Sequence, residues 1–237
     1  MAVWLRHLSE RIRARRGNHS PTPPLKKEFW TAGLALYEES FGTHLRAHQK
    51  ELAKRIAEMP DVTQSNRQQY FSEKRPKLVL RAVHKLFPDA FTSPPLTILD
   101  VGCGFGDYLA LFRRAGHRAA GTIYGPTIDD FLFMHRRLGL RVLLHDAASS
   151  FLPFRDECCD VVWCSSMITL DSMLGKTEHI MAELQRVLKP GGRLILRTHV
   201  EKLPLHGLKA PVDLAPADGQ LLFADEKDFV WQKPTLQ

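Results

Sequence analysis

LTILDVGCGFGDYLALFRRAG, residues 96–116, is the stretch from which the fold class follows. A short apolar run ends at Asp100, and three glycines then alternate with other residues before a helical pattern begins. Glycine has no Cβ, so it allows a sharp turn and lets the backbone approach a ligand closely. The pattern therefore predicts a strand, a ligand-binding loop and a helix in succession.

The spacing of the glycines argues against a phosphate ligand at this loop. Gly102, Gly104 and Gly106 form G-x-G-x-G, whereas the dinucleotide fingerprint is G-x-G-x-x-G. Asp107 follows at the predicted helix N-terminus, where an acid would repel a phosphate. No Gly-Lys-Ser/Thr follows, which excludes a P-loop. An acidic glycine loop suits a cationic or zwitterionic ligand that carries no phosphate.

Short apolar runs alternate with helical patterns along the rest of the chain. Alternation of this kind predicts βαβ units and a parallel sheet whose strands all end at one edge, where ligands bind. The last segment, 219–234, has two apolar runs around a charged turn, as in an antiparallel hairpin. The five predicted parallel strands are 96–101, 118–124, 141–146, 160–166 and 192–199.

Composition limits the class of protein. The chain has 237 residues, 44% hydrophobic and 25% charged, which is ordinary for a globular protein. No apolar run approaches the roughly 18 residues that cross a bilayer, and the start lacks the apolar region of a secretory signal. The four cysteines form neither a disulfide framework nor a zinc spacing. We expect a cytoplasmic protein with no transmembrane segment and no metal site.

The basic charge belongs to the N-terminal third. Residues 1–90 hold 17 Lys and Arg against 9 Asp and Glu, a net charge of +8, while the remainder carries −1. Residues 3–16 form a basic amphipathic pattern suited either to peripheral membrane contact or to docking. A proline-rich linker follows, and apolar spacing predicts a helix over 31–59 and another that starts near Pro76. We assign residues 1–75 to a helical extension, a lid or docking segment, and 76–237 to the main domain.

Four segments in order resemble class I S-adenosylmethionine-dependent methyltransferases of the type 11 domain. LDVGCGFGDY is similar to their first motif, and the terminal hairpin to their last two strands. HDAASSFLPFRDECCDVVWCSSMI (145–168) and HIMAELQRVLKPGGRLIL (179–196) are similar to the segments between. The resemblance implies a doubly wound, mostly parallel, Rossmann-like α/β sheet of seven strands, order 3-2-1-4-5-7-6, with strand 7 antiparallel. It also implies S-adenosyl-L-methionine as cofactor and a transferase activity.

The resemblance assigns cofactor roles to residues at the strand ends. The glycine loop would wrap the methionine part, with Asp100 at the loop or the amino group. Asp146 would accept a hydrogen bond from the adenine amine, and Ala147 would supply a backbone contact. Cys164 and Ser165 would lie near the methionine amino group. The remaining implied cofactor positions are Gly102, Cys103, Gly104, Gly106, Ile123 and Tyr124.

Two departures from the family pattern stand out. Ile123 occupies the place of the acid that usually holds the ribose hydroxyls, with Tyr124 beside it as a weaker polar contact. Losing that charge-assisted pair would weaken binding about ten- to a hundredfold. Only about 20 residues separate the fifth strand from the hairpin, so the usual helix there is replaced by a loop. The long N-terminal helices are candidates to cover the sheet face that this leaves open.

The sequence leaves the methyl acceptor open. Alignment of the reactants supplies most of the rate in methyl transfer, and a base is needed only if the acceptor must lose a proton. His199 and Asp171 are the candidate bases after the fifth and fourth strands. The leading hypothesis is a small-molecule, saccharide or lipid-linked acceptor. The alternatives are an RNA or protein methyltransferase that docks through the basic N-terminal third, or a degenerate fold that no longer methylates. The oligomeric state is left undetermined.

Overall fold

The computed structural model describes residues 27–58, 71–123, 129–147, 150–168 and 173–235. The amphipathic pattern at residues 3–16 lies outside these ranges. Within the described ranges, no helix combines the length and the apolar character that crossing a membrane requires.

Seven strands of the described chain form one sheet, in the order β3-β2-β1-β4-β5-β7-β6. The first five strands pair in parallel, and β7 runs antiparallel to both β5 and β6. This confirms the predicted fold class and strand order. The strands are β1 (Thr97–Val101), β2 (Arg118–Ile123), β3 (Val142–Leu144), β4 (Cys159–Ser165), β5 (Leu188–Arg197), β6 (Gln220–Ala224) and β7 (Asp228–Gln232).

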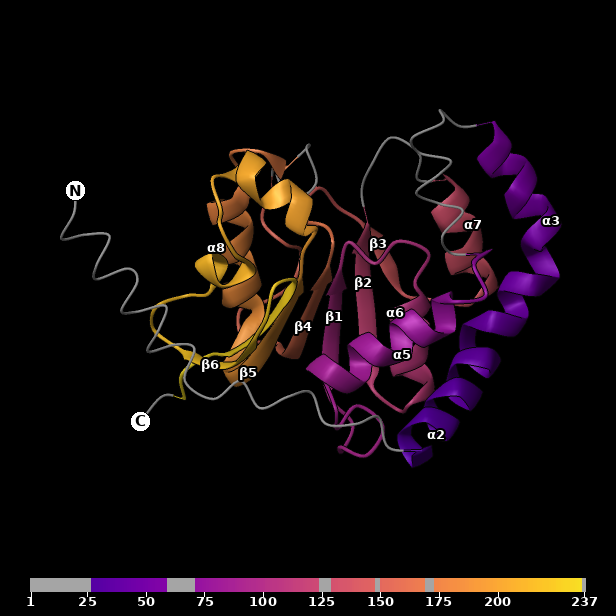
Figure 1. The fold of residues 1–237 in the computed structure, drawn as a ribbon, viewed down its shortest axis with the longest axis horizontal. Helices are drawn as coiled ribbons and strands as arrows, with labels where there is room; N and C mark the ends of the chain where they lie inside the picture. The colour runs from indigo at the N-terminus through magenta and orange to yellow at the C-terminus, as the bar shows by residue number, and fades with distance from the viewer. Residues whose placement is uncertain (1–26, 59–70, 124–128, 148–149, 169–172, 236–237) are drawn as a thin grey trace.

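Helices cover both faces of the sheet (Figure 1). Alternate residues of each strand point to opposite faces, so Ile98 and Trp163 join one apolar core while Leu99 and Val162 join the other. The first core includes side chains of α5 (Arg75–Leu86), α6 (Asp107–Arg114) and α7 (Asp129–Arg137), and the second includes those of α8 (Thr177–Val187). Helix α5 begins with a proline in its first turn, as predicted.

A helical arm precedes the sheet and packs outside the helices of the first face (Figure 1). It consists of α2 (Lys27–Tyr37), the π-helical turn η1 (Glu38–Gly42) and α3 (Thr43–Ala57). Helix α2 contacts α5 and α6, η1 contacts α6, and α3 contacts α7. The prediction of a helix over 31–59 is right in kind, but the arm starts four residues earlier and contains the π turn. The boundary between residues 75 and 76 stays a prediction.

The connection between β5 and the hairpin is short, as the sequence indicated. Two 3-10 turns replace a helix there, η4 (Val200–His206) and η5 (Pro211–Leu214). Leu214 of η5 joins the second core, with Leu208 packed against it. The expectation that the N-terminal helices cover this face is therefore wrong for the described arm, because the arm packs on the opposite face.

Candidate functional site

The carboxyl ends of the parallel strands meet at one edge of the sheet, and the described candidate residues lie there. Asp100 and the glycine loop belong to the end of β1, Ile123 ends β2, Asp146 follows β3 and Cys164 lies at the end of β4. This convergence is what a shared binding site requires. The other described candidates at this edge are Gly102, Cys103, Gly104, Gly106, Ala147 and Ser165.

The glycine loop is a tight turn fixed at both ends. Gly102 donates its N–H to the Thr122 carbonyl at 3.0 Å, which ties the loop to β2. Gly102 has φ +76°, and a Cβ there would lie 2.7 Å from Cβ of Met167. Gly106, with φ +84°, is the N-cap of α6, and a Cβ on it would collide with Leu140. Both positions require glycine for conformation and for space.

His135 on α7 supports the middle of the loop. Its Nε2 lies 2.7 Å from the Gly104 carbonyl oxygen, so this nitrogen carries the proton and donates. Burial lowers the pKa of His135 to about 4, which keeps the ring neutral at neutral pH. Cys103 packs its Sγ 3.9 Å from the same Nε2, and burial raises the pKa of this thiol well above its usual range. Cys103 is therefore a buried thiol that packs within the loop.

Two buried carboxyl groups lie at the loop, and they differ in their partners. Asp107 Oδ2 accepts from Arg75 Nε at 2.7 Å, so the acid at the start of α6 is paired. Asp100 is 1% exposed, and its Oδ2 is buried without a hydrogen-bond partner in the structure. Burial, and then the charge of Asp107, raise the pKa of Asp100 well above its usual range. A buried carboxyl oxygen without a partner marks a place where a donor is missing.

The end of β4 lies against the glycine loop. Burial, followed by the charge of Asp100, raises the pKa of Cys164 to about 12, so this thiol stays protonated. Ser166 has φ +64° and donates its N–H to the Arg197 carbonyl at 2.9 Å. Left-handed backbone costs a non-glycine residue about 1–2 kcal/mol and often occurs at functional sites. The turn brings Met167 against Gly102.

The part of the chain from β1 through β5 matches a known family. A profile for the methyltransferase domain matches residues 99–196, which cover this segment. The order and directions of the strands are those that the sequence resemblance implied. Residues 99–196 are thus similar in sequence to the methyltransferase domain, and the strand order agrees with the class I methyltransferase fold.

Individual relatives of the chain differ in the compounds that their names say they methylate. The dimethylglycine N-methyltransferase of Parasynechococcus marenigrum is 29% identical over 119 residues, which cover 47% of this chain and 41% of that protein. The probable tRNA methyltransferase 9B of Homo sapiens is 31% identical over 103 residues, which cover 44% and 21%. The crystal structure of a SAM dependent methyltransferase from Archaeoglobus fulgidus aligns with a TM-score of 0.51 at 15% identity, covering 70% and 97%. The matches thus span less than half the length of these two curated relatives, and the structural likeness concerns the fold.

S-adenosylmethionine is the cofactor that the match implies, and the residues at the glycine loop fit it in charge. Its ammonium and sulfonium groups are cations, and an ammonium N–H suits the buried Asp100 oxygen that has no partner. Arg75 balances Asp107 but leaves Asp100 available. The bare backbone at Gly102 and Gly104 offers close approach. These features agree with a zwitterionic ligand and would disfavour a phosphate.

The positions expected to bind the ribose and the adenine fit this cofactor less completely. Ile123 is 4% exposed and belongs to the first apolar core, so its side chain serves the fold. Tyr124 lies outside the described residues. Ala147 is buried in the second core, next to Asp146 after β3. A charged side chain that binds the ribose hydroxyls would therefore have to come from an element other than β2. The cofactor roles of these residues stay predictions.

One of the two candidate bases, His199, lies within the described residues. His199 follows β5, its side chain is 44% exposed, and its Nδ1 lies 3.4 Å from Glu201 Oε1. Asp171 lies outside the described residues. His199 thus lies after β5, at the carboxyl end of the parallel strands.

Sequence reasoning missed a polar network that joins the arm-side helices to the far strands. Arg197 donates to Tyr108 Oη at 2.7 Å and to Asp228 Oδ1 at 3.0 Å. Lys85 approaches the other oxygen of Asp228 at 2.5 Å. Tyr37 of the arm is buried with a hydroxyl that has no hydrogen-bond partner in the structure. Because the partners are 31 to 143 residues apart, no local sequence pattern signals the network.

Proposed function

We propose that this chain is an S-adenosylmethionine-dependent methyltransferase. The observation that carries the proposal is Asp100, a buried carboxyl group at the end of β1 with an oxygen that lacks a partner. It adjoins a glycine loop held by His135, in a chain whose residues 99–196 match the methyltransferase domain. A backbone-lined site with a buried carboxyl group of this kind suits a cationic cofactor.

The chain's own residues would act by binding and alignment. S-adenosylmethionine, when bound, supplies a methyl group on a positively charged sulfur. Asp100 would accept from the cofactor's ammonium group, and the Gly102–Gly106 loop would hold the methionine part by backbone contact. Asp146 and Ala147 would position the adenine. Correct alignment of reactants accounts for about 7–11 kcal/mol of a barrier in favourable cases.

For the acceptor, we propose a small molecule, a saccharide or a lipid-linked molecule that enters on the β4 and β5 side. His199 is the described residue placed to take a proton there, oriented by Glu201. Asp171 stays a candidate from sequence. The relative named dimethylglycine N-methyltransferase supports an acceptor of this size. The helical arm would then act as a lid or docking segment.

RNA is the second candidate acceptor. A groove with three arginines between α3 and α7 favours it, because phosphate groups bind such surfaces. The relative named probable tRNA methyltransferase 9B agrees with it. A protein acceptor and a fold that no longer methylates are the remaining alternatives.

The proposal is tested by following the methyl group. The purified chain is incubated with methyl-tritiated S-adenosylmethionine and with separate RNA, protein and small-molecule extracts. We expect label in one fraction, and none with Gly104→Arg, which places a large side chain where φ is +53°. Label in no fraction, from a chain that binds S-adenosylhomocysteine, would contradict the enzymatic proposal and favour the degenerate fold.

A further inference from the structure

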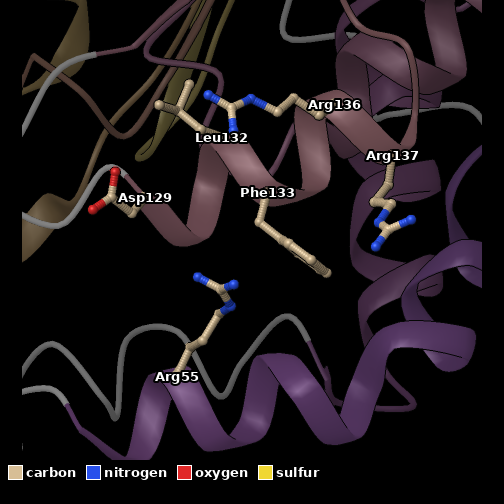
Figure 2. Close-up of a pocket in the computed structure, with 6 residues that line it drawn as sticks. All are labelled: Arg55, Asp129, Leu132, Phe133, Arg136 and Arg137. Atoms are coloured by element: carbon tan, nitrogen blue, oxygen red, sulfur yellow. The ribbon is translucent and has the colours of Figure 1, made fainter.

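A groove lies between α3 of the helical arm and α7, and Figure 2 shows its side chains. Its volume is about 510 Å³, within the range of small-molecule sites. Helix α7 lies at the β2 and β3 end of the sheet (Figure 1), so the groove is separate from the β4 and β5 side where the acceptor is expected. The described lining consists of Arg55 from α3 and Asp129, Leu132, Phe133, Arg136 and Arg137 from α7.

Among the described residues, positive charge exceeds negative charge in the groove. Three arginines and one carboxylate, that of Asp129, line the groove. Arg55 pairs with Glu51 on its own helix at 3.2 Å, but its Nε is buried without a hydrogen-bond partner in the structure. Arg136 and Arg137 form no ion pair with any described residue. Like charges gathered in one groove repel each other, and a bound anion would relieve that repulsion.

An aromatic ring holds two of the guanidinium groups in place. Arg55 lies 4.8 Å and Arg137 lies 5.3 Å from the centre of the Phe133 ring. Figure 2 shows Arg55 extending from α3 toward α7. Stacking uses the flat face of a guanidinium and leaves its N–H edge free for a planar or tetrahedral oxyanion. The groove is therefore prepared for an anion before one binds.

The chemistry of the groove favours phosphate over a membrane surface. Phosphate accepts several charge-assisted hydrogen bonds at once, which suits three arginines better than a single carboxylate would. Membrane insertion needs exposed apolar side chains beside the charge. The large exposed apolar side chains of the described chain lie elsewhere than on α3 or α7: they are Leu78, Leu143, Leu144, Phe151, Leu174, Leu205 and Leu222.

We propose that the groove between α3 and α7 is a binding site for a phosphate group. The phosphate belongs either to a free phosphorylated small molecule or to the backbone of RNA. The site is distinct from the glycine loop, whose buried acids disfavour phosphate, so the proposal does not depend on the methyl-transfer activity.

Direct binding separates the two sources. One arm titrates the full chain with inorganic pyrophosphate and with a ribonucleoside monophosphate by calorimetry. The other arm follows a labelled single-stranded RNA by fluorescence anisotropy over a range of salt concentrations. The test variant is Arg136→Gln/Arg137→Gln. The control is Lys77→Gln/Arg81→Gln, which removes the same two charges from exposed positions on α5.

We expect the affinity of the groove variant to be at least tenfold lower than that of the parent chain, and the affinity of the control to be unchanged. Binding of the small phosphates with this dependence identifies a phosphorylated small ligand. Binding of RNA alone identifies the backbone, and the slope of log affinity against log salt should then shrink by about 1.4 for two lost contacts. The proposal is overturned if neither probe binds at millimolar concentration, or if both variants bind like the parent chain.

Discussion

Arg75 Nε donates to Asp107 Oδ2 at 2.7 Å, and this buried pair joins α5 to the start of α6 directly behind the glycine loop. The two side chains are 13% and 2% exposed. Arg75 lies outside the matched segment 99–196, whereas Asp107 lies inside it. The pair thus links the matched segment to the helix that precedes it, and its contribution to stability can be measured.

Arg75→Met should destabilise the protein by about 3–5 kcal/mol, because it leaves Asp107 buried without its partner. Chemical denaturation measures the change in free energy of unfolding. Arg114→Met is the matched control, since Arg114 pairs with Glu39 on the exposed surface and should lose at most about 1 kcal/mol. Equal losses in both variants would contradict a structural role for the buried pair. Adding Asp107→Asn to Arg75→Met should recover part of the loss.

Gly102→Ala should reduce both stability and cofactor affinity. The new Cβ would meet Met167 at 2.7 Å, in addition to the strain of a positive φ. Gly116→Ala separates the steric clash from the backbone strain. Gly116 also has a positive φ, +98°, but a Cβ added there would meet nothing within 4 Å. This control should lose only the backbone contribution, about 1–2 kcal/mol. Thermal unfolding compares the two, and an equal loss would show that the contact with Met167 is unimportant.

Asp100→Asn should raise stability at neutral pH while it lowers cofactor affinity. The folded-state pKa of Asp100 is raised above its unfolded value, so its contribution to stability is present below pH 3.8 and is lost as pH rises through the folded pKa. The neutral amide of asparagine does not ionise, so it avoids that loss of stability. It is, however, a weaker hydrogen-bond acceptor for an ammonium group than a carboxylate is. Melting temperature and titration with S-adenosylhomocysteine measure the two effects. Asp218→Asn, at an exposed position, should change neither.

His135 should give the protein a pH-dependent stability. Its folded pKa of about 4 lies below the unfolded value of 6.5, so its stabilising contribution is full above pH 6.5 and is lost as pH falls toward 4. The loss over that window is on the order of 3 kcal/mol. Denaturation at pH 7 and pH 4.5 should show a smaller difference for His135→Gln than for the parent chain. His44→Gln, exposed on α3, should keep the parent's difference; if both variants match the parent, His135 does not titrate as described.

The sequence predicted the sheet better than the arm. Apolar runs with fixed spacing define β1, β2 and β4 to within one or two residues, because each of these strands is a short and largely buried apolar run. The π turn at 38–42 leaves the apolar spacing of Tyr37 and Phe41 intact, so periodicity alone reads it as ordinary helix.

The site was predicted where it depends on local sequence and missed where it depends on distant contacts. Asp100 and the glycines follow one another in the chain, and their backbone geometry follows from residue type. His135 reaches Gly104 across 31 positions, and the arginines of the groove come from two helices. Such pairings are fixed by packing in three dimensions, and a single sequence does not encode them in any local pattern.

Cofactor binding at the glycine loop is measured most directly by calorimetric titration of the full chain with S-adenosylmethionine and with S-adenosylhomocysteine. We expect binding in the micromolar range, strongly weakened by Gly104→Arg in a variant that keeps its fold by circular dichroism. If neither compound bound to the folded parent chain, the result would contradict the proposed cofactor site. Ile123, in place of the acid that usually holds the ribose hydroxyls, would then account for the lack of binding.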